Sequence, residues 1–285
     1  MALNLTFVIF VRDEARRIEY FLRNVKWCGE ILVMIDDRTV DNTAEIAKSF
    51  GARVHLFKHT GWTEGEEMTD FVIGLVHTDW IYWGYVDELI ALPLVKKFAE
   101  LSKQDVYSVV WVRRKNYNYG GVNMHNPYTL RFFKKGTIDF KGNIIGHFGK
   151  VVAPAGEILY LPQRDDMSIH HFSTYNLEKF ELAHSRYSTL EAEDNIKSGY
   201  RGFSGFKLVV KPIYLFILFY VRGGAWRWGW RGLIICANYS FFYFNILAKM
   251  WEIENGVTLA SIEEEYDRLK EKLLNENKSG RHAGH

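Results

Sequence analysis

Short apolar runs alternate with amphipathic stretches along the first third of the chain. The run from Leu5 to Val11 is nearly continuous and rich in β-branched residues, which is typical of a strand buried on both faces of a parallel sheet. The next stretch spaces its apolar residues as one face of a helix. Strands are predicted at 5–11, 31–35, 53–57, 80–85, 107–112, 128–133 and 158–161, and helices at 15–25, 43–50 and 66–77. This alternation predicts an α/β fold built from right-handed βαβ units.

Acidic pairs follow three of these predicted strands. Asp13-Glu14 comes after the first, Asp36-Asp37 ends the second, and Asp87-Glu88 follows the fourth. Ligands in parallel α/β sheets bind beyond the carboxyl ends of the strands. We therefore expect the functional site at this edge of the sheet, where these carboxylates would meet.

The pattern changes after about residue 203. Two mostly apolar stretches, 208–221 and 232–250, flank a segment in which Trp226, Trp228 and Trp230 alternate with basic residues. Neither stretch is an uninterrupted span of about twenty apolar residues. Tryptophan beside arginine suits the headgroup region of a bilayer, so we predict interfacial helices on a membrane surface. A buried helical hairpin or an oligomer interface is the alternative. The predicted domains are 1–203, the α/β domain, and 204–285, a helical membrane-associating extension with a charged final helix.

Charge and cysteine content narrow the classes of function. The formal net charge is +2, so general attraction to nucleic acid is not expected. Two cysteines in unrelated contexts suit a reducing cytosol and provide no thiolate metal site. The N-terminal apolar run lacks a preceding basic region and a small-residue cleavage site, which favours a first strand over a signal peptide.

Several motifs together resemble one enzyme family. The first strand is FVIFVRDE and the second leads into IDDRTVDNT. Further matching segments are Trp27-Cys28-Gly29-Glu30-Ile31, Asp79-Trp80, Val86-Asp87-Glu88, His171-Phe172-Ser173 and Gly229-Trp230-Arg231-Gly232. Over residues 4–252 the chain resembles the family 2 glycosyltransferases with the GT-A fold, and especially the branch that adds sugars to lipopolysaccharide cores and related glycolipids.

Glycosyl transfer from a nucleotide sugar needs a base-recognition edge, a cation for the departing diphosphate and a base for the acceptor hydroxyl. Asp36 or Asp37 can accept hydrogen bonds from the nucleoside. The full set expected to bind the donor is Val11, Asp13, Glu14, Asp36, Asp37 and Val86. Asp87 is the expected oxygen ligand of Mn²⁺ or Mg²⁺, and the resemblance implies that His171 completes the metal site. The alternatives are that the aspartates cap helices and that His171 is a hydrogen-bonded loop residue.

Three positions depart from the family pattern. Tyr85 stands where the metal motif usually begins with Asp. The helix after the third strand reads Glu64-Gly65-Glu66-Glu67, where the family usually offers a Gln, Lys or Arg near the donor phosphates, and these glutamates would repel a diphosphate unless a cation intervenes. The usual His-Glu dipeptide is His147-Phe148, so we predict His147 as the general base, with Asp165 or Asp166 as substitutes. Of these, His147 and Asp166 are the predicted catalytic residues.

The predicted function is an inverting glycosyl transfer to a glycan or lipid-linked acceptor at a membrane surface. The enzyme would be cytoplasmic and peripheral on the inner face of the membrane, would contact lipid through 208–251, and can form oligomers. A degenerate member that binds a nucleotide sugar or glycan without turnover is the second hypothesis. A nucleotidyltransferase ranks last, because the residues after the first strand lack the glycines of a phosphate loop.

Overall fold

The computed structural model describes residues 3–58, 65–121, 126–143, 148–199 and 202–282. The chain forms two compact units. Unit 1 comprises Met1–Glu181 and Ile217–Cys236, and unit 2 comprises Leu182–Phe216 and Ala237–His285. Each unit is therefore built from two separate stretches of the chain, and Ile217–Cys236 belongs to the unit that holds the sheet.

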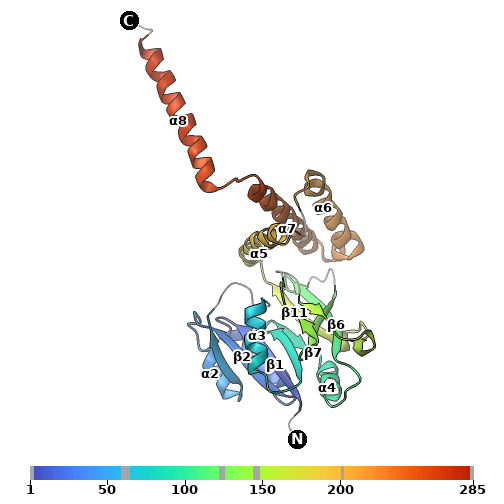
Figure 1. Ribbon diagram of the computed structural model, residues 1–285. Coiled ribbons are helices and arrows are strands. Elements are labelled where there is room, and N and C mark those ends of the chain that lie inside the picture. Colours follow the sequence, from blue (N-terminus) through green and yellow to red (C-terminus); the bar gives the residue numbers. More distant parts are fainter. Residues whose placement is uncertain (1–2, 59–64, 122–125, 144–147, 200–201, 283–285) are drawn as a thin grey trace. The chain divides into compact units, whose positions relative to one another are not determined.

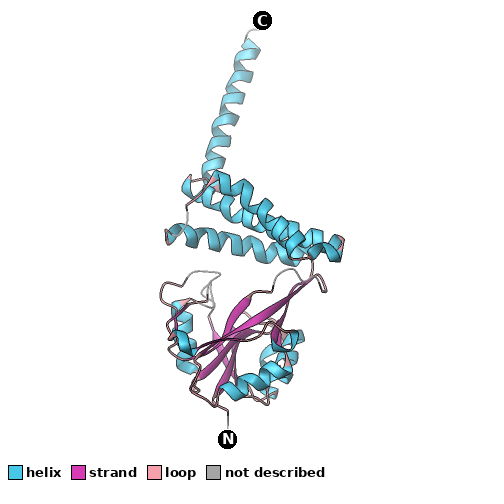
Figure 2. Cartoon of the chain, turned by 90° about the vertical axis from the view of Figure 1, so that its right-hand side faces the viewer, coloured by secondary structure: helices cyan, strands magenta, loops and turns pink. Residues whose placement is uncertain are grey.

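The N-terminal half of unit 1 is a parallel sheet. Strand β1 (Leu5–Val11) lies between β2 (Glu30–Asp36) and β4 (Trp80–Tyr85), and β3 (Arg53–Phe57) pairs with β2, all in parallel. The intervening helices are α1 (Ala15–Val25), α2 (Thr43–Ser49) and α3 (Glu66–Leu75). Helices flank the strands on both sides (Figure 2). The βαβ order predicted from the apolar pattern is confirmed.

The other half of the sheet is mixed. Strand β7 (Tyr128–Lys134) is antiparallel to β4 and to β6 (Val109–Asn118), and the sheet order is β3-β2-β1-β4-β7-β6-β11-β5. The remaining elements are β5 (Glu88–Ile90), α4 (Leu92–Leu101), β10 (Ile158–Tyr160), β11 (Ser168–Thr174), the small ribbon β8 (Ile138–Asp139) with β9 (Lys150–Val151), and the short helices η1 (Ala155–Glu157) and η2 (Asp165–Met167). Figure 1 locates β6, β7 and β11 beside one another.

Two apolar cores cover the two faces of the sheet. One packs α1 and α4 against β1, β4 and β7, and includes the parallel stack of Trp80 on Phe132 and of Phe132 on Phe98. The other packs α3 against the opposite face around Trp83. Burying one such side chain contributes about 1.5–3 kcal/mol. All seven residues of β1 are buried because both faces of the strand are covered. The carboxyl ends of the strands therefore sit on a rigid base.

Helix α5 (Leu177–Lys197) lies before residue 203 and was not predicted from the sequence. The chain after residue 203 is helical, as predicted, and its elements are α6 (Gly205–Ile217), η3 (Leu218–Arg222), η4 (Ala225–Trp228), α7 (Trp230–Glu254) and α8 (Leu259–His282). Within the described residues, α7 alone has the length and composition of a membrane span, and part of it is buried in the protein. The core helices of soluble proteins meet the same criterion, so α7 by itself does not assign a membrane.

Candidate functional site

The acidic residues that follow three strands meet at one sheet edge. Parallel pairing aligns Val11 with Ile35 and Phe10 with Tyr85, so β1, β2 and β4 end at the same level. The pairs Asp13-Glu14 and Asp36-Asp37, together with Asp87, therefore leave the sheet together. This is the arrangement expected from the sequence.

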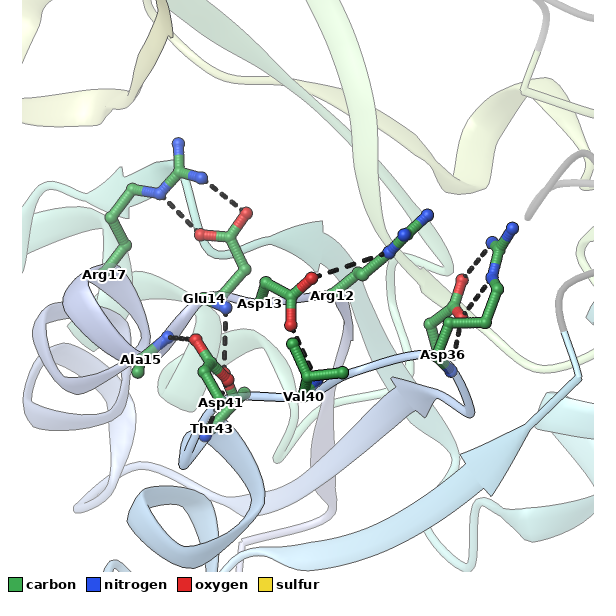
Figure 3. A network of polar contacts seen from close by, with 10 residues as sticks. Arg12, Asp13, Glu14, Ala15, Arg17, Asp36, Val40, Asp41 and Thr43 are labelled. Atoms are coloured by element: carbon green, nitrogen blue, oxygen red, sulfur yellow. Dashed lines mark hydrogen bonds and ion pairs between the residues drawn. The ribbon is translucent and has the colours of Figure 1, made fainter.

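The first two loops at this edge are tied to each other by hydrogen bonds from backbone amides to side-chain oxygens (Figure 3). The Val40 amide donates to Asp13 Oδ1 at 2.8 Å, the Ala15 amide to Asp41 Oδ2 at 3.0 Å, and the Glu14 amide to Thr43 Oγ1 at 2.8 Å. Asp13 holds a left-handed φ of 52°, which is costly for a residue other than glycine. The loops thus form a fixed cradle, and one oxygen of Asp13 is used in building it.

Asp36 is buried and forms a fork with Arg38. Arg38 Nε donates to Oδ1 at 2.8 Å and Nη2 to Oδ2 at 2.6 Å, and this hydrogen-bonded pairing raises the pKa of Arg38. The neighbouring Asp37 is exposed, and its amide donates to the Phe57 carbonyl at 3.0 Å. Asp37 therefore presents the more accessible carboxylate, whereas Asp36 would act on a nucleoside together with Arg38.

Asp87 and His171 face each other across β5 and β11. Asp87 Oδ2 lies 3.4 Å from His171 Nε2, and His171 Nδ1 lies 2.9 Å from Asn116 Oδ1. An Nδ1–H that donates to Asn116 leaves Nε2 as the nitrogen available to a metal. The two positions that the sequence predicted as metal ligands are thus adjacent, and Asn116 orients the histidine.

The second carboxylate oxygen of Asp87 is a candidate ligand for a cation. Asp87 Oδ1 is buried and has no hydrogen-bond partner among the described residues, which is unusual for a carboxylate. Burial opposes ionisation of Asp87, but His171, Arg17 and Arg114 outweigh it and hold the pKa below its ordinary value. Such an oxygen would suit a hard divalent ion, which would neutralise charge on a bound diphosphate. The described residues contain no group of three or more His, Cys, Asp or Glu side chains able to hold a metal, so Asp87 and His171 would be the protein's contribution.

Glu14 and Arg17 form an ion pair beside Asp87. Arg17 Nε lies 2.5 Å from Glu14 Oε2, Arg17 Nη2 donates to Oε1 at 2.6 Å, and Arg17 Nη1 donates to Tyr175 Oη at 3.3 Å. Burial raises the pKa of Glu14, and the charges of Asp87 and Asp41 add to the rise against the opposing effect of Arg17. Arg17 thus supplies positive charge at the edge, although helix α3 begins with glutamates.

A buried network supports the segment that carries Asp87. Glu88 Oε1 lies 3.3 Å from Arg131 Nε, and Tyr82 Oη donates to Glu88 Oε2 at 3.1 Å. Pairing of β6 with β7 skips Arg131, so this residue is the bulge that turns its side chain toward Glu88. The guanidinium also lies 5.2 Å from the ring centre of Tyr85. Tyr85 therefore packs on the guanidinium of Arg131, at the position where the glycosyltransferases that the sequence resembles usually have an acidic residue.

Of the two predicted catalytic residues, only Asp166 lies within the described part of the chain. His147 lies outside the described residues. Asp166 is exposed and paired with Arg164 at 2.7 Å, in η2. It lies five positions before His171 and outside the strand β11 that carries the histidine. Asp166 would need a different acceptor position to act in catalysis.

Sequence reasoning missed Arg17, Asn116 and Arg131 as members of the site. Arg17 follows Glu14 by three residues on a helical turn, a spacing that predicts the pair. Asn116 would have required the pairing of β6 with β11, and Arg131 the bulge in β7. Neither has a signal in the local sequence.

Part of the aromatic tail lies against unit 1's own loop after β6. A Cβ at Gly121 would lie 3.3 Å from the Trp228 ring, and one at Gly120 would lie 3.9 Å from Arg231 Nη1. A Cβ at Gly232 would overlap the Ala225 carbonyl, so glycine is required where η4 meets α7. The tryptophan and arginine segment is thus fixed beside the carboxyl end of β6.

No family model matches the chain. The chain is 25% identical over 254 residues to the lipopolysaccharide core biosynthesis glycosyltransferase LpsC of Rhizobium meliloti, covering 86% of this chain and 91% of that protein. It is also 25% identical to an uncharacterized glycosyltransferase of Rickettsia felis, covering 86% of this chain and 88% of the relative.

Solved structures with similar architecture include a mannosyltransferase of Pyrobaculum calidifontis in complex with GDP-Man and Mn²⁺, with a TM-score of 0.49, 11% identity, and coverage of 88% of this chain and 85% of that one. Another is S. aureus TarS 1–349 in complex with UDP-GlcNAc, with a TM-score of 0.45, 14% identity, and coverage of 90% and 92%.

The chain is an enzyme of the nucleotide-sugar glycosyltransferase class, as predicted from its motifs. Its relatives align along nearly their whole lengths, and the mixed sheet with helices on both faces is that of the expected GT-A fold.

Proposed function

We propose that this protein transfers a sugar from a nucleotide-sugar donor to a glycan or lipid-linked acceptor at a membrane surface, with inversion at the anomeric carbon. The observation that carries the proposal is the buried, unpartnered Oδ1 of Asp87 beside His171, at the edge where three strands end. A divalent ion bound there would neutralise charge on the departing diphosphate.

Different residues of the site would contact different parts of the donor. The Asp36–Arg38 fork and the exposed Asp37 suit the nucleoside, while the loops that hold Asp13 and Glu14 fix the floor of the cradle, with Val11 and Val86 as buried neighbours. Arg17 and Arg114 bring positive charge toward Asp87 and thus toward the phosphates. This replaces the basic residue missing at the start of α3.

In the reaction, the acceptor oxygen would bond to the anomeric carbon while the bond from that carbon to the diphosphate breaks. The hydroxyl proton passes to a base. His147 remains our proposed base, and Asp166 its substitute. Family 2 membership in the lipopolysaccharide-core branch is likewise a proposal, supported by the motifs and by the name of the Rhizobium relative.

A row of exposed apolar side chains on α6 supports membrane contact. Phe206, Val210, Ile213 and Ile217 are separated by three or four residues and all are exposed, with the exposed Lys207 beside them. This α6 apolar stripe has the chemistry of an interfacial helix: an apolar face for acyl chains and lysine for anionic headgroups. We place the enzyme on the cytoplasmic, inner face of the membrane, where a water-soluble donor would enter at the sheet edge while α6 contacts lipid.

Calorimetric titration with a panel of nucleotide sugars, with and without Mn²⁺, tests the proposal. We expect wild-type protein to bind a donor only with the ion and Asp87→Ala to lose that binding. Asp105→Ala is the control, because Asp105 is an exposed carboxylate paired with Lys134 far along the chain. Donor binding that is identical in Asp87→Ala would overturn the metal-assisted site.

A binding protein without turnover is the second candidate. Tyr85 in place of a carboxylate favours it, because one oxygen ligand is missing. Release of nucleoside diphosphate from the bound donor separates the two, since a binder releases none.

A further inference from the structure

One face of β6 carries a row of aromatic and charged side chains that the proposed donor site does not use. Trp111, Arg113, Lys115 and Tyr117 alternate along the strand and therefore project to the same side, whereas Val112 projects to the opposite core. From the first to the last of them the strand rises roughly 20 Å. This surface, which we term the β6 strip, is long enough for several sugar rings.

Each partly buried residue of the strip supports an exposed one on a neighbouring element. Tyr160 is 57% exposed and its ring lies parallel to that of Trp111, with centroids 6.0 Å apart and an interplanar angle of 5°. Phe172 is 40% exposed and stacks on Tyr117, with centroids 4.9 Å apart and an angle of 10°. Two exposed aromatic rings are thus held in place near the two ends of the strip.

A carboxylate lies between the two rings. Arg113 Nη1 donates to Asp165 Oδ1 at 2.7 Å and Lys115 Nζ to Oδ2 at 2.6 Å, while the Asp165 side chain remains 61% exposed. A carboxylate has about four lone-pair positions, so each oxygen retains one for an incoming hydroxyl group. Because both cations fix Asp165, a ligand would bind it with little additional loss of side-chain entropy.

This order of ring, carboxylate and ring fits a carbohydrate chain. The C–H faces of a sugar ring pack on exposed aromatic rings, and its hydroxyl groups donate charge-assisted hydrogen bonds to a fixed carboxylate. An anionic lipid surface fits less well, because Asp165, which is more exposed than the Arg113 and Lys115 side chains that hold it, carries negative charge.

The strip is connected to the proposed site through the backbone of β11. Phe172 follows His171 directly, and its amide donates to the Asp87 carbonyl at 2.8 Å. Because neighbouring residues of a strand project to opposite faces, Phe172 and His171 lie on opposite faces of β11. A glycan that stacks on Phe172 would therefore have to pass the end of β11 to reach the residues proposed to hold the donor diphosphate.

We propose that the β6 strip is a binding subsite for the acceptor glycan, which is an extended, hydroxyl-rich oligosaccharide rather than a single sugar. The proposal rests on the proposed glycosyl transfer for the identity of the ligand as acceptor. The binding of a glycan to the strip does not require donor, metal or turnover.

Binding without donor to an array of immobilised lipopolysaccharide core oligosaccharides tests the subsite. We expect wild-type protein to bind members of the array, and Tyr160→Ala and Asp165→Asn each to weaken that binding about threefold to tenfold. Tyr160 lies on β10 beside Trp111, at the end of the strip that is far from Phe172 and Asp87, so its replacement should leave the donor site intact. Tyr20→Ala, which removes an exposed ring on α1, is the matched control and should bind as wild type.

Either of two results would overturn the subsite: wild-type protein binds no oligosaccharide of the array, or both strip variants bind as tightly as wild type. Calorimetry with nucleotide sugars on the same preparations distinguishes a failure of the glycan subsite from a failure of the proposed donor site. Strip variants that bind donor normally but lose glycan support the subsite, while loss of donor binding in Asp87→Ala concerns only the donor site.

Discussion

The strand ends of unit 1 and helix α6 of unit 2 differ in the solvent exposure of their large apolar side chains. At the strand ends, aromatic residues such as Trp83 are buried, and carboxylates such as Asp36 are held by specific partners, whereas Asp87 Oδ1 has none among the described residues. On α6, large residues such as Phe206 and Ile213 are exposed in one stripe. Large apolar side chains thus form a buried core in one region and an exposed face in the other.

This difference separates the roles of the two regions. Removing a supporting residue at the sheet edge should cost folding free energy, because a buried charge would lose its partner. Removing an exposed residue from α6 should cost little folding free energy and weaken only an external interaction. Stability and surface binding therefore respond to different substitutions, and each can be measured in the same preparations.

The largest expected effect is on the buried pair beneath Asp87. Arg131→Ala leaves Glu88 charged and buried without its partner, so the free energy of unfolding should fall by about 3–5 kcal/mol. Urea denaturation measures this loss. The control is Arg164→Ala, which breaks the exposed pair with Asp166 and should cost at most about 1 kcal/mol. Equal, small losses in both variants would show that the edge has no buried support.

The next effect is on catalysis. Asp87→Ala should reduce sugar transfer roughly 100-fold or more, since charge on the departing diphosphate would lose its stabilisation. The free energy of unfolding should fall by less than in Arg131→Ala, because the loss of the contact with His171 is partly offset by removal of a buried oxygen that has no hydrogen-bond partner among the described residues. Turnover with the donor identified by calorimetry and urea denaturation measure the two quantities. A variant that is unstable but fully active would reverse our interpretation of this carboxylate.

A smaller effect is expected on membrane binding. Phe206→Ser with Ile213→Ser should lower partitioning onto vesicles of anionic phospholipid by roughly tenfold or more, given about 1.5–3 kcal/mol for each buried apolar side chain. The thermal midpoint should stay near that of wild type. Tyr20→Ser on α1 controls for the loss of any exposed ring. Unchanged flotation with vesicles would leave the α6 stripe to a protein contact instead.

The smallest effect concerns pH. Hydrogen bonds from Lys115 and then Arg113 hold the pKa of Asp165 below its ordinary value, despite the opposing effect of burial. Its stabilising contribution is therefore complete above about pH 4 and is lost as the pH falls through the folded-state pKa. Urea midpoints measured from pH 6 to pH 2.5 should converge for wild type and Asp165→Asn at the acid end. A constant difference over the whole range would exclude this linkage.

Local patterns predicted the parallel half of the fold better than the mixed half. The runs at β1, β2 and β4 are buried on both faces, so each strand is evident from its own residues. The position of β11 between β6 and β5 depends on pairing between distant segments, which no local pattern encodes. The same holds within the site: Asp87 and His171 were found as motif residues, whereas Asn116 and Arg131 act through strand register and a bulge.

The most direct test of the central claim is pulsed electron paramagnetic resonance of Mn²⁺ added to the protein with UDP or GDP. Coordination by His171 Nε2 predicts a ¹⁴N coupling to the ion in wild type that disappears in His171→Gln. Absence of the coupling in wild type, or its persistence in His171→Gln, would contradict a metal-assisted site formed by Asp87 and His171.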